Sequence, residues 1–224
     1  MEVRLAFSNN QLNKLLYGLV AIEVLFVLIF FIDYLLGTPI WIIHTYFYLD
    51  GEMNIPAWFS SIQLSLVGIV FLLRAYQPVS SDYPSPVFML MLGAGFLFLS
   101  ADELTKIHET FSKTLKSIEW VPRFKGGNGL WISVYLLLCL TFVLTTYRHF
   151  CAMWNLYRKE SFFMMTGIMV FLLGAVGFEI ISYQFLRDDT SSMLYQVEVA
   201  VEEFLEMMGI SLVLYGSILF SAKE

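Results

Sequence analysis

Charged residues are scarce in this chain. Only 14% of its 224 residues are Asp, Glu, Lys or Arg, whereas a soluble domain carries about a quarter. Hydrophobic residues make up 58%, and the mean hydropathy is +0.71. No run of basic residues occurs, so the composition gives no indication of nucleic-acid binding. The sequence therefore predicts an integral membrane protein that forms one domain over residues 1–224.

Cysteine and histidine are also rare. Cys139 and Cys151 would lie about 18 Å apart on one helix, which is too far for a disulfide. Three histidines are too few for a membrane enzyme built on a histidine-rich metal box. The chain contains no Walker loop and no GxSxG, HExxH or GxGxxG motif. The common motif-defined enzyme classes are therefore not indicated.

Six apolar stretches are long enough to cross a hydrocarbon layer of about 30 Å. Segments rich in Gly, Pro or Ser separate them. We expect an all-α fold, a polytopic bundle of about six transmembrane helices. The predicted spans are 12–36, 57–76, 86–112, 129–150, 161–186 and 195–221. The third span is expected to continue as a helix beyond the membrane, and the first is interpreted as a membrane helix because no A-x-A cleavage site follows it.

Six spans place both termini on one side of the membrane. That side would carry seven of the 13 Lys and Arg residues and the other side six, which is a weak positive-inside signal. The first loop on the far side, residues 37–56, contains no Lys or Arg. We therefore expect cytoplasmic termini, in a bacterial inner membrane or its equivalent.

Two acidic clusters lie within apolar stretches. One extends from Asp102 to Glu109, and the other from Glu198 to Glu206. An acid at the centre of a membrane helix costs roughly 2.5 to 3.5 kcal/mol on translocon scales. Acids at this depth must be paired, protonated or bound to a ligand, so the clusters predict a functional site.

The acids are predicted to lie at similar depths in the membrane. With a rise of 1.5 Å per residue, Asp102 and Glu179 lie near the outer boundary. Glu202 and Glu206 lie about 10 Å and 16 Å below it. Glu23 alone lies near the midplane. Most of the unusual acids therefore share the outer half of the membrane.

Helical phase suggests that these acids face a common interior. Asp102 and Glu109, seven residues apart, are expected on one face of the third span, and Glu202 and Glu206 on one face of the sixth. Glu179 follows glycines at 174 and 177, which are expected to allow a close helix approach.

Oxygen ligands with one imidazole indicate a metal site that prefers hard ions. Iron or manganese is favoured, with zinc or calcium as alternatives. The predicted ligands are Asp102, His108, Glu109, Glu179, Glu202 and Glu206. Ferritin-like di-iron sites share this ligand type, but the Glu-x-x-His pair that they repeat on two helices is absent here.

Three functions remain open on these grounds. The first is a metal-dependent membrane enzyme, an oxidoreductase or hydrolase that acts on a lipid or quinone. The second is a proton- or cation-coupled transporter or channel, because intramembrane acids also form proton relays and ion paths. The third is a structural subunit of an oligomer or membrane complex, whose acids are protonated or paired. Membrane lipids are expected partners in all three cases, and nucleic acid in none.

Overall fold

The computed structural model describes residues 8–51, 53–77, 84–116, 124–125 and 129–223, and these ranges contain helices and no strand. Six helices are long and apolar enough to span a membrane, which confirms the predicted all-α polytopic fold. They are α1 (Asn9–Leu35), α3 (Ile55–Ala75), α4 (Pro86–Thr105), α6 (Leu130–Leu156), the continuous helix Arg158–Leu186 and α9 (Met193–Ser221). Two shorter helices, α2 (Trp41–Phe47) and α5 (Ile107–Leu115), accompany them.

The sequence marks the starts of several spans with capping residues. The Ser8 hydroxyl accepts a hydrogen bond from the Gln11 backbone N–H, and Asn54 does the same for Ala57 at the start of α3. Ser85 and Ser192 cap α4 and α9 in the same way. These side chains satisfy backbone donors that have no partner within the helix, so they fix where each helix begins.

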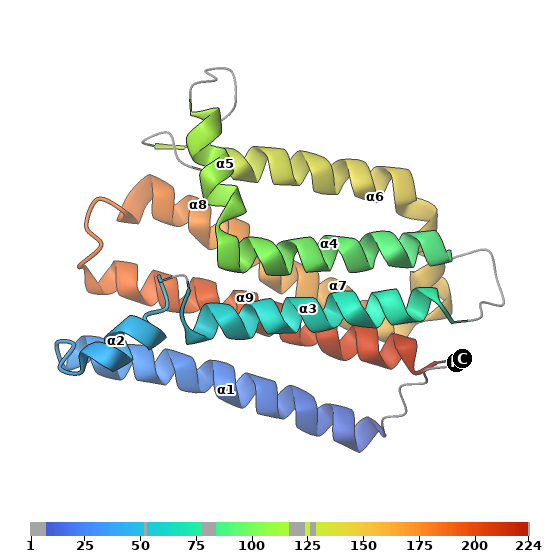
Figure 1. The fold of residues 1–224 in the computed structure, drawn as a ribbon, viewed down its shortest axis with the longest axis horizontal. Helices are drawn as coiled ribbons and strands as arrows, with labels where there is room; N and C mark the ends of the chain where they lie inside the picture. Colours follow the sequence, from blue (N-terminus) through green and yellow to red (C-terminus); the bar gives the residue numbers. More distant parts are fainter. Residues whose placement is uncertain (1–7, 52, 78–83, 117–123, 126–128, 224) are drawn as a thin grey trace.

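The long helices lie side by side along the long axis of the molecule (Figure 1). α1 begins and α9 ends at the same end of the bundle, whereas α2 and α5 lie at the opposite end. In the apolar stretch of α9 72% of the residues are buried, and in that of α3 56%, but only 17% in α1 and α6. α9 and α3 therefore form the centre of the bundle.

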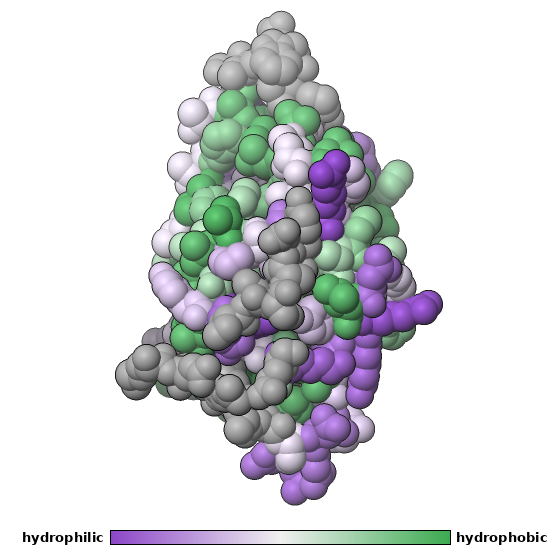
Figure 2. Space-filling view, turned by 90° about the vertical axis from the view of Figure 1, so that its right-hand side faces the viewer, coloured by the Kyte–Doolittle hydropathy of each residue, from purple (hydrophilic) through white to green (hydrophobic). Residues whose placement is uncertain are grey.

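The outer helices expose apolar side chains, as expected for contact with lipid. On α6, Leu137, Leu138 and Leu144 are all more than 60% exposed. Cys139 and Cys151 are free and exposed, in agreement with the prediction that they form no disulfide. Figure 2 looks onto the end where α1 begins and α9 ends, and hydrophilic side chains gather there among apolar ones.

The third predicted span, 86–112, is two helices instead of one. α4 ends at Thr105, and Lys106 has a left-handed backbone conformation with φ of 55°. α5 then runs across the end of the bundle (Figure 1). Because the chain turns at Lys106, Asp102 and Glu109 do not share the face of a single helix, and the helical phase predicted for them is wrong.

The fifth span departs from regular α-helix near its outer end. It consists of α7 (Arg158–Leu172), the π-helical segment η2 (Leu173–Phe178), the short α8 (Glu179–Ile181) and a second π-helical segment, η3 (Ser182–Leu186). π-helical turns are rare and frequently occur at functional sites. The two turns flank Glu179, one of the predicted ligands.

Candidate functional site

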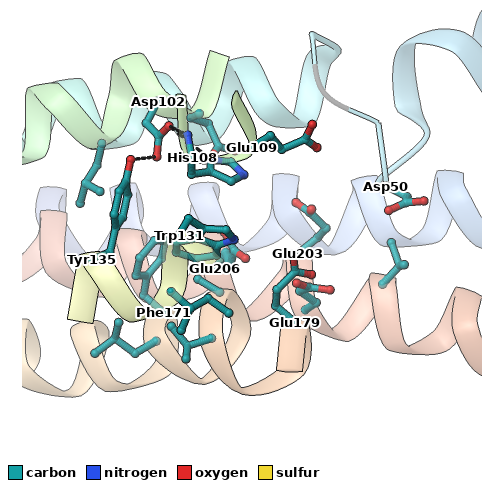
Figure 3. Close-up of a pocket in the computed structure, with 18 of the residues that line it drawn as sticks. Asp50, Asp102, His108, Glu109, Trp131, Tyr135, Phe171, Glu179, Glu203 and Glu206 are labelled. Carbon is teal, nitrogen blue, oxygen red and sulfur yellow. Dashed lines mark hydrogen bonds and ion pairs between the residues drawn. The ribbon is translucent and has the colours of Figure 1, made fainter. Parts of the chain in front are cut away.

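A cavity of about 530 Å³ lies toward the end of the bundle opposite the termini, and carboxylates dominate its polar lining (Figure 3). The acids come from four helices and the loop between α2 and α3: Asp50, Asp102, Glu103, Glu109, Glu179, Glu202, Glu203 and Glu206. Among the described residues that line the cavity, the basic side chains are His108 and Arg187. The cavity thus brings all six predicted ligands to one place, although their role as ligands remains a prediction.

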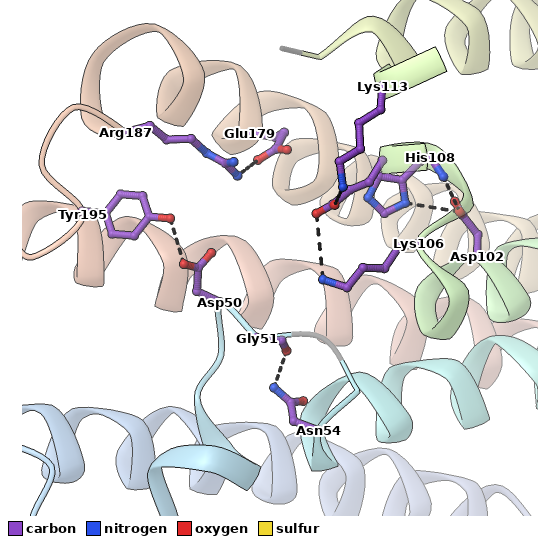
Figure 4. Close-up of polar contacts among 11 residues, drawn as sticks. Asp50, Gly51, Asn54, Asp102, Lys106, His108, Lys113, Glu179, Arg187 and Tyr195 are labelled. Atoms are coloured by element: carbon purple, nitrogen blue, oxygen red, sulfur yellow. Dashed lines mark hydrogen bonds and ion pairs between the residues drawn. The ribbon is translucent and has the colours of Figure 1, made fainter. Parts of the chain in front are cut away.

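Asp102 and His108 form a hydrogen-bonded pair across the turn at Lys106 (Figure 4). Asp102 Oδ1 accepts from the His108 backbone N–H at 2.8 Å and lies 3.2 Å from His108 Nδ1. The Tyr135 hydroxyl donates to Asp102 Oδ2 at 3.3 Å. A carboxylate that holds one imidazole nitrogen orients the ring, as partners of metal-bound histidines commonly do. This geometry favours Asp102 as the group that positions His108.

Glu109 lies between two lysines at the rim of the cavity. Its Oε2 is 3.0 Å from Lys113 Nζ, and its Oε1 is 3.9 Å from Lys106 Nζ. Partial burial raises the pKa of Glu109, but the Lys113 hydrogen bond and the two lysine charges outweigh it and hold the pKa below its ordinary value. Glu109 is thus an ionised carboxylate that already has cationic partners.

Glu179 pairs with Arg187 on the other side of the cavity, at 3.2 Å. The Arg187 guanidinium also lies over the Tyr183 ring, 4.4 Å from its centroid. Burial lowers the pKa of Arg187, but the nearby carboxylates of Glu179 and Asp50 more than compensate and raise it. The guanidinium therefore remains charged and neutralises part of the acidic lining.

Asp50 extends the acidic lining into the loop before α3. Its Oδ2 accepts from the Tyr195 hydroxyl on α9 at 2.9 Å, and Asn54 holds the loop through the carbonyls of Tyr48 and Gly51 (Figure 4). Burial and the Asp50 charge raise the pKa of Tyr48, which keeps this tyrosine protonated. Asp50 is thus fixed toward the cavity by hydrogen bonds from neutral donors.

Glu202 and Glu206 on α9 differ from these because their charged neighbours are other acids. Among the described residues, the charged groups that act on Glu206 are Glu203, Glu103 and Glu179. No ion pair within the described part of the chain includes Glu202 or Glu206. Glu206 is therefore at the centre of a group of acids formed with Glu103, Glu179 and Glu203.

A close helix approach places these acids near Glu179. A Cβ atom at Gly174 would lie 2.7 Å from the Glu202 carbonyl oxygen and 2.9 Å from Glu206 Cγ, so η2 and α9 could not pack so closely with a larger residue there. Gly177 does not contribute in this way, because a Cβ there would meet only Leu173 in its own helix. The predicted role in packing against another helix holds for Gly174 and is wrong for Gly177.

The lining suits a hard cation by ligand type, but the described side chains are not gathered into a coordination sphere. No group of three or more His, Cys, Asp or Glu residues in the described ranges is close enough to hold a metal ion. Carboxylate oxygens are nevertheless the donors that manganese, iron and calcium accept. Metal binding here would require side chains that now face the cavity to converge on the ion.

Several lining residues were not predicted as ligands. Glu103, Glu203 and Arg187 line the cavity, although none of them is among the predicted ligands. Trp131 and Tyr135 also line the cavity, and their spacing of four residues at the start of α6 places both on one helix face. Their rings lie 5.4 Å apart between centroids, and Trp131 is 5.1 Å from the ring of His108.

The fold and the site define a six-helix protein of the membrane-spanning class with an acid-lined cavity near one end. The chain belongs to a family described as a domain of unknown function, DUF8692, whose model matches residues 18–220. No curated protein and no solved structure matches the chain.

Proposed function

We propose that this protein binds a cation in its acid-lined cavity, in the outer half of the membrane. The proposal rests on one observation: eight carboxylates line a cavity whose described basic side chains are His108 and Arg187. Arg187 is already engaged by Glu179, and no ion pair of the described residues includes Glu202 or Glu206, so a bound cation would offset the charge of these two carboxylates. A hard metal ion, iron or manganese, fits the oxygen donors best, and zinc or calcium are alternatives.

The cavity also has room for a substrate beside an ion. Its volume lies within the range of about 300 to 1,000 Å³ typical of small-molecule sites. Trp131, Leu136 and Phe171 provide apolar lining on helices that expose apolar surface. These features support a metal-dependent membrane enzyme, an oxidoreductase or hydrolase that acts on a lipid or quinone. In such an enzyme the bound metal would supply Lewis-acid or redox chemistry, and His108, oriented by Asp102, would be one of the residues that hold it.

Proton- or cation-coupled transport is the second candidate, and one specific observation favours it. Glu23 is fully buried in the middle of α1, so a second ionisable group lies at membrane depth, away from the cavity lining. For either function we propose cytoplasmic termini in a bacterial inner membrane or its equivalent. The basic residues near the ends of α3 and α9, among them Arg74 and Lys223, support this orientation.

Manganese titration of detergent-purified, chelator-treated protein tests the proposal. We expect saturable Mn²⁺ binding to the wild type and at least about tenfold weaker binding to Glu206→Gln, which removes the carboxylate at the centre of the acidic group. Asp188→Asn is the matched control, because Asp188 is an exposed acid at the same end, pairs with Lys125 and does not line the cavity.

Elemental analysis of protein purified without chelator identifies the natural ion. Stoichiometric iron, manganese, zinc or calcium that is absent from Glu206→Gln would support the cation site. If the wild type neither retains nor binds any of these ions, the metalloenzyme is excluded, and transport or a subunit role in a larger complex remains.

A further inference from the structure

Glu23 lies apart from the acidic cavity and has a different environment. Its side chain is 0% exposed, although most of the apolar stretch of α1 faces outward. Residues of α3 and α9, the two most buried helices, cover it: Gln63 is 1% exposed and Ser211 is 0% exposed. The first span thus directs one carboxyl group into the centre of the bundle, midway across the membrane.

The hydrogen bonds around Glu23 satisfy only one of its two oxygens. The Ser211 hydroxyl donates to Glu23 Oε1 at 2.6 Å, and Gln63 Nε2 donates to the same oxygen at 3.1 Å. Gln63 Nε2 also donates to Ser211 Oγ at 2.8 Å, which closes a ring of three side chains. Glu23 Oε2 and Gln63 Oε1 are buried without a hydrogen-bond partner among the described residues.

In the part of the chain that the structure describes, no charged group pairs with this carboxyl. No ion pair of the described residues includes Glu23, and the side chains that act on it are the neutral Ser211 and Gln63. Along the three packed helices, the nearest acidic and basic residues are Lys14 and Asp33 on α1, Arg74 on α3 and Glu206 on α9. Two tyrosines are closer in sequence: Tyr17 is 70% exposed, and the Tyr215 hydroxyl donates to Asn13 Oδ1. Glu206 is five residues from Ser211, about 7.5 Å along the helix axis, and it too is an acid.

We propose that Glu23, Gln63 and Ser211 form a proton-binding site in the middle of the membrane. A proton on Oε2 makes the carboxyl neutral and removes the cost of burying a charge that no described cation offsets, while Oε1 remains the acceptor for Ser211 and Gln63. A metal ion fits less well, because it needs several oxygen ligands, whereas Gln63 presents its NH₂ group to the carboxyl. None of the three residues lines the cavity, so the proposed proton site does not depend on cation binding in the cavity.

Infrared difference spectroscopy of protein reconstituted in lipid tests this assignment. The wild type minus Glu23→Gln spectrum at neutral pH should contain the C=O stretch of a protonated carboxylic acid, and this band should shift in D₂O. Ser211→Ala should retain the band and move it to higher frequency, because a hydrogen bond to Oε1 is lost. Carboxylate stretches in place of the acid band would overturn the proposal.

Thermal unfolding distinguishes whether the Glu23 site binds a proton or a metal cation such as sodium. Gln has the shape of a protonated Glu, so Glu23→Gln should unfold at nearly the wild-type temperature, in NaCl and in choline chloride alike. A wild-type unfolding temperature that rises with NaCl at constant ionic strength, and does not do so in Glu23→Gln, would assign the site to sodium and overturn the proton. Ser211→Ala provides the infrared test if Glu23→Gln does not fold.

Discussion

The cavity and the Glu23 site place the same chemical group in opposite surroundings. In the cavity, Glu206 faces other carboxylates, and the Arg187 guanidinium in the lining is already engaged by Glu179. At mid-membrane, Glu23 is alone and is met only by a hydroxyl and an amide. A group of acids can be stabilised by a shared cation, whereas a lone acid needs no more than a proton. In our proposal, this difference in the number of carboxylates distinguishes a cation site in the cavity from a proton site at Glu23.

The largest effect is expected from separating η2 from α9, whose close packing places Glu202 and Glu206 near Glu179. In Gly174→Val the new side chain collides with the Glu202 carbonyl and the Glu206 side chain, and overpacking of this kind costs roughly 1 to 3 kcal/mol. We expect a lower unfolding temperature and weaker Mn²⁺ binding. Gly95→Val is the control, because a Cβ at Gly95 meets nothing within 4 Å. Equal losses in the two variants would contradict the packing argument, and the Glu23 infrared band should persist in both.

A smaller effect, on Mn²⁺ binding, is expected when the hydrogen bonds between Asp102 and His108 are lost. Asp102→Asn replaces the carboxylate that holds both the backbone and the ring of His108, and loss of such an orienting partner typically weakens metal binding about 10- to 100-fold. Mn²⁺ titration measures the change. Tyr135→Phe removes only the 3.3 Å hydrogen bond to Asp102 and should bind almost as the wild type does. If Asp102→Asn binds normally, His108 does not contribute to the cation site.

The smallest effect, on the free energy of unfolding, is expected from the ion pairs of Glu109 at the rim of the cavity. The pKa of Glu109 is lowered, so its ion pairs stabilise the protein above its ordinary pKa, and this stabilisation is lost as the pH falls through the lowered value. Because Glu109 is 38% exposed, Lys113→Met should cost only about 0.2 to 0.5 kcal/mol at pH 7. The free energy of unfolding of the two proteins should converge in acid. A difference that persists below pH 3 would show that packing, not charge, is responsible.

The pattern of apolar residues was sufficient to predict the six spans. The helical rise per residue also predicted that acids far apart in the sequence lie in the same half of the membrane. The turn at Lys106 could not be predicted, because Lys106 itself adopts the left-handed conformation and no Gly or Pro marks the turn in the sequence. Helical phase alone therefore placed Asp102 and Glu109 on one face. They reach the same cavity by another route, since the turn directs α5 across it.

Individual contacts were less predictable than location. Nothing in the sequence distinguishes Gly174, which meets α9, from Gly177, which faces only its own helix. Similarly, Glu103 and Glu203 reach the cavity because of how α4 and α9 are rotated against their neighbours, which depends on packing across the whole bundle. The position of Glu23 near the middle of the membrane was predicted from the sequence. Its partners Gln63 and Ser211 were not, because they lie on two other helices.

The most direct test of the contrast between the two sites is one Mn²⁺ titration of three proteins: the wild type, Glu206→Gln and Glu23→Gln. The wild type and Glu23→Gln should bind with the same affinity, and Glu206→Gln at least about tenfold more weakly. Equal binding by all three proteins, or a loss confined to Glu23→Gln, would contradict the assignment of a cation to the cavity and a proton to Glu23.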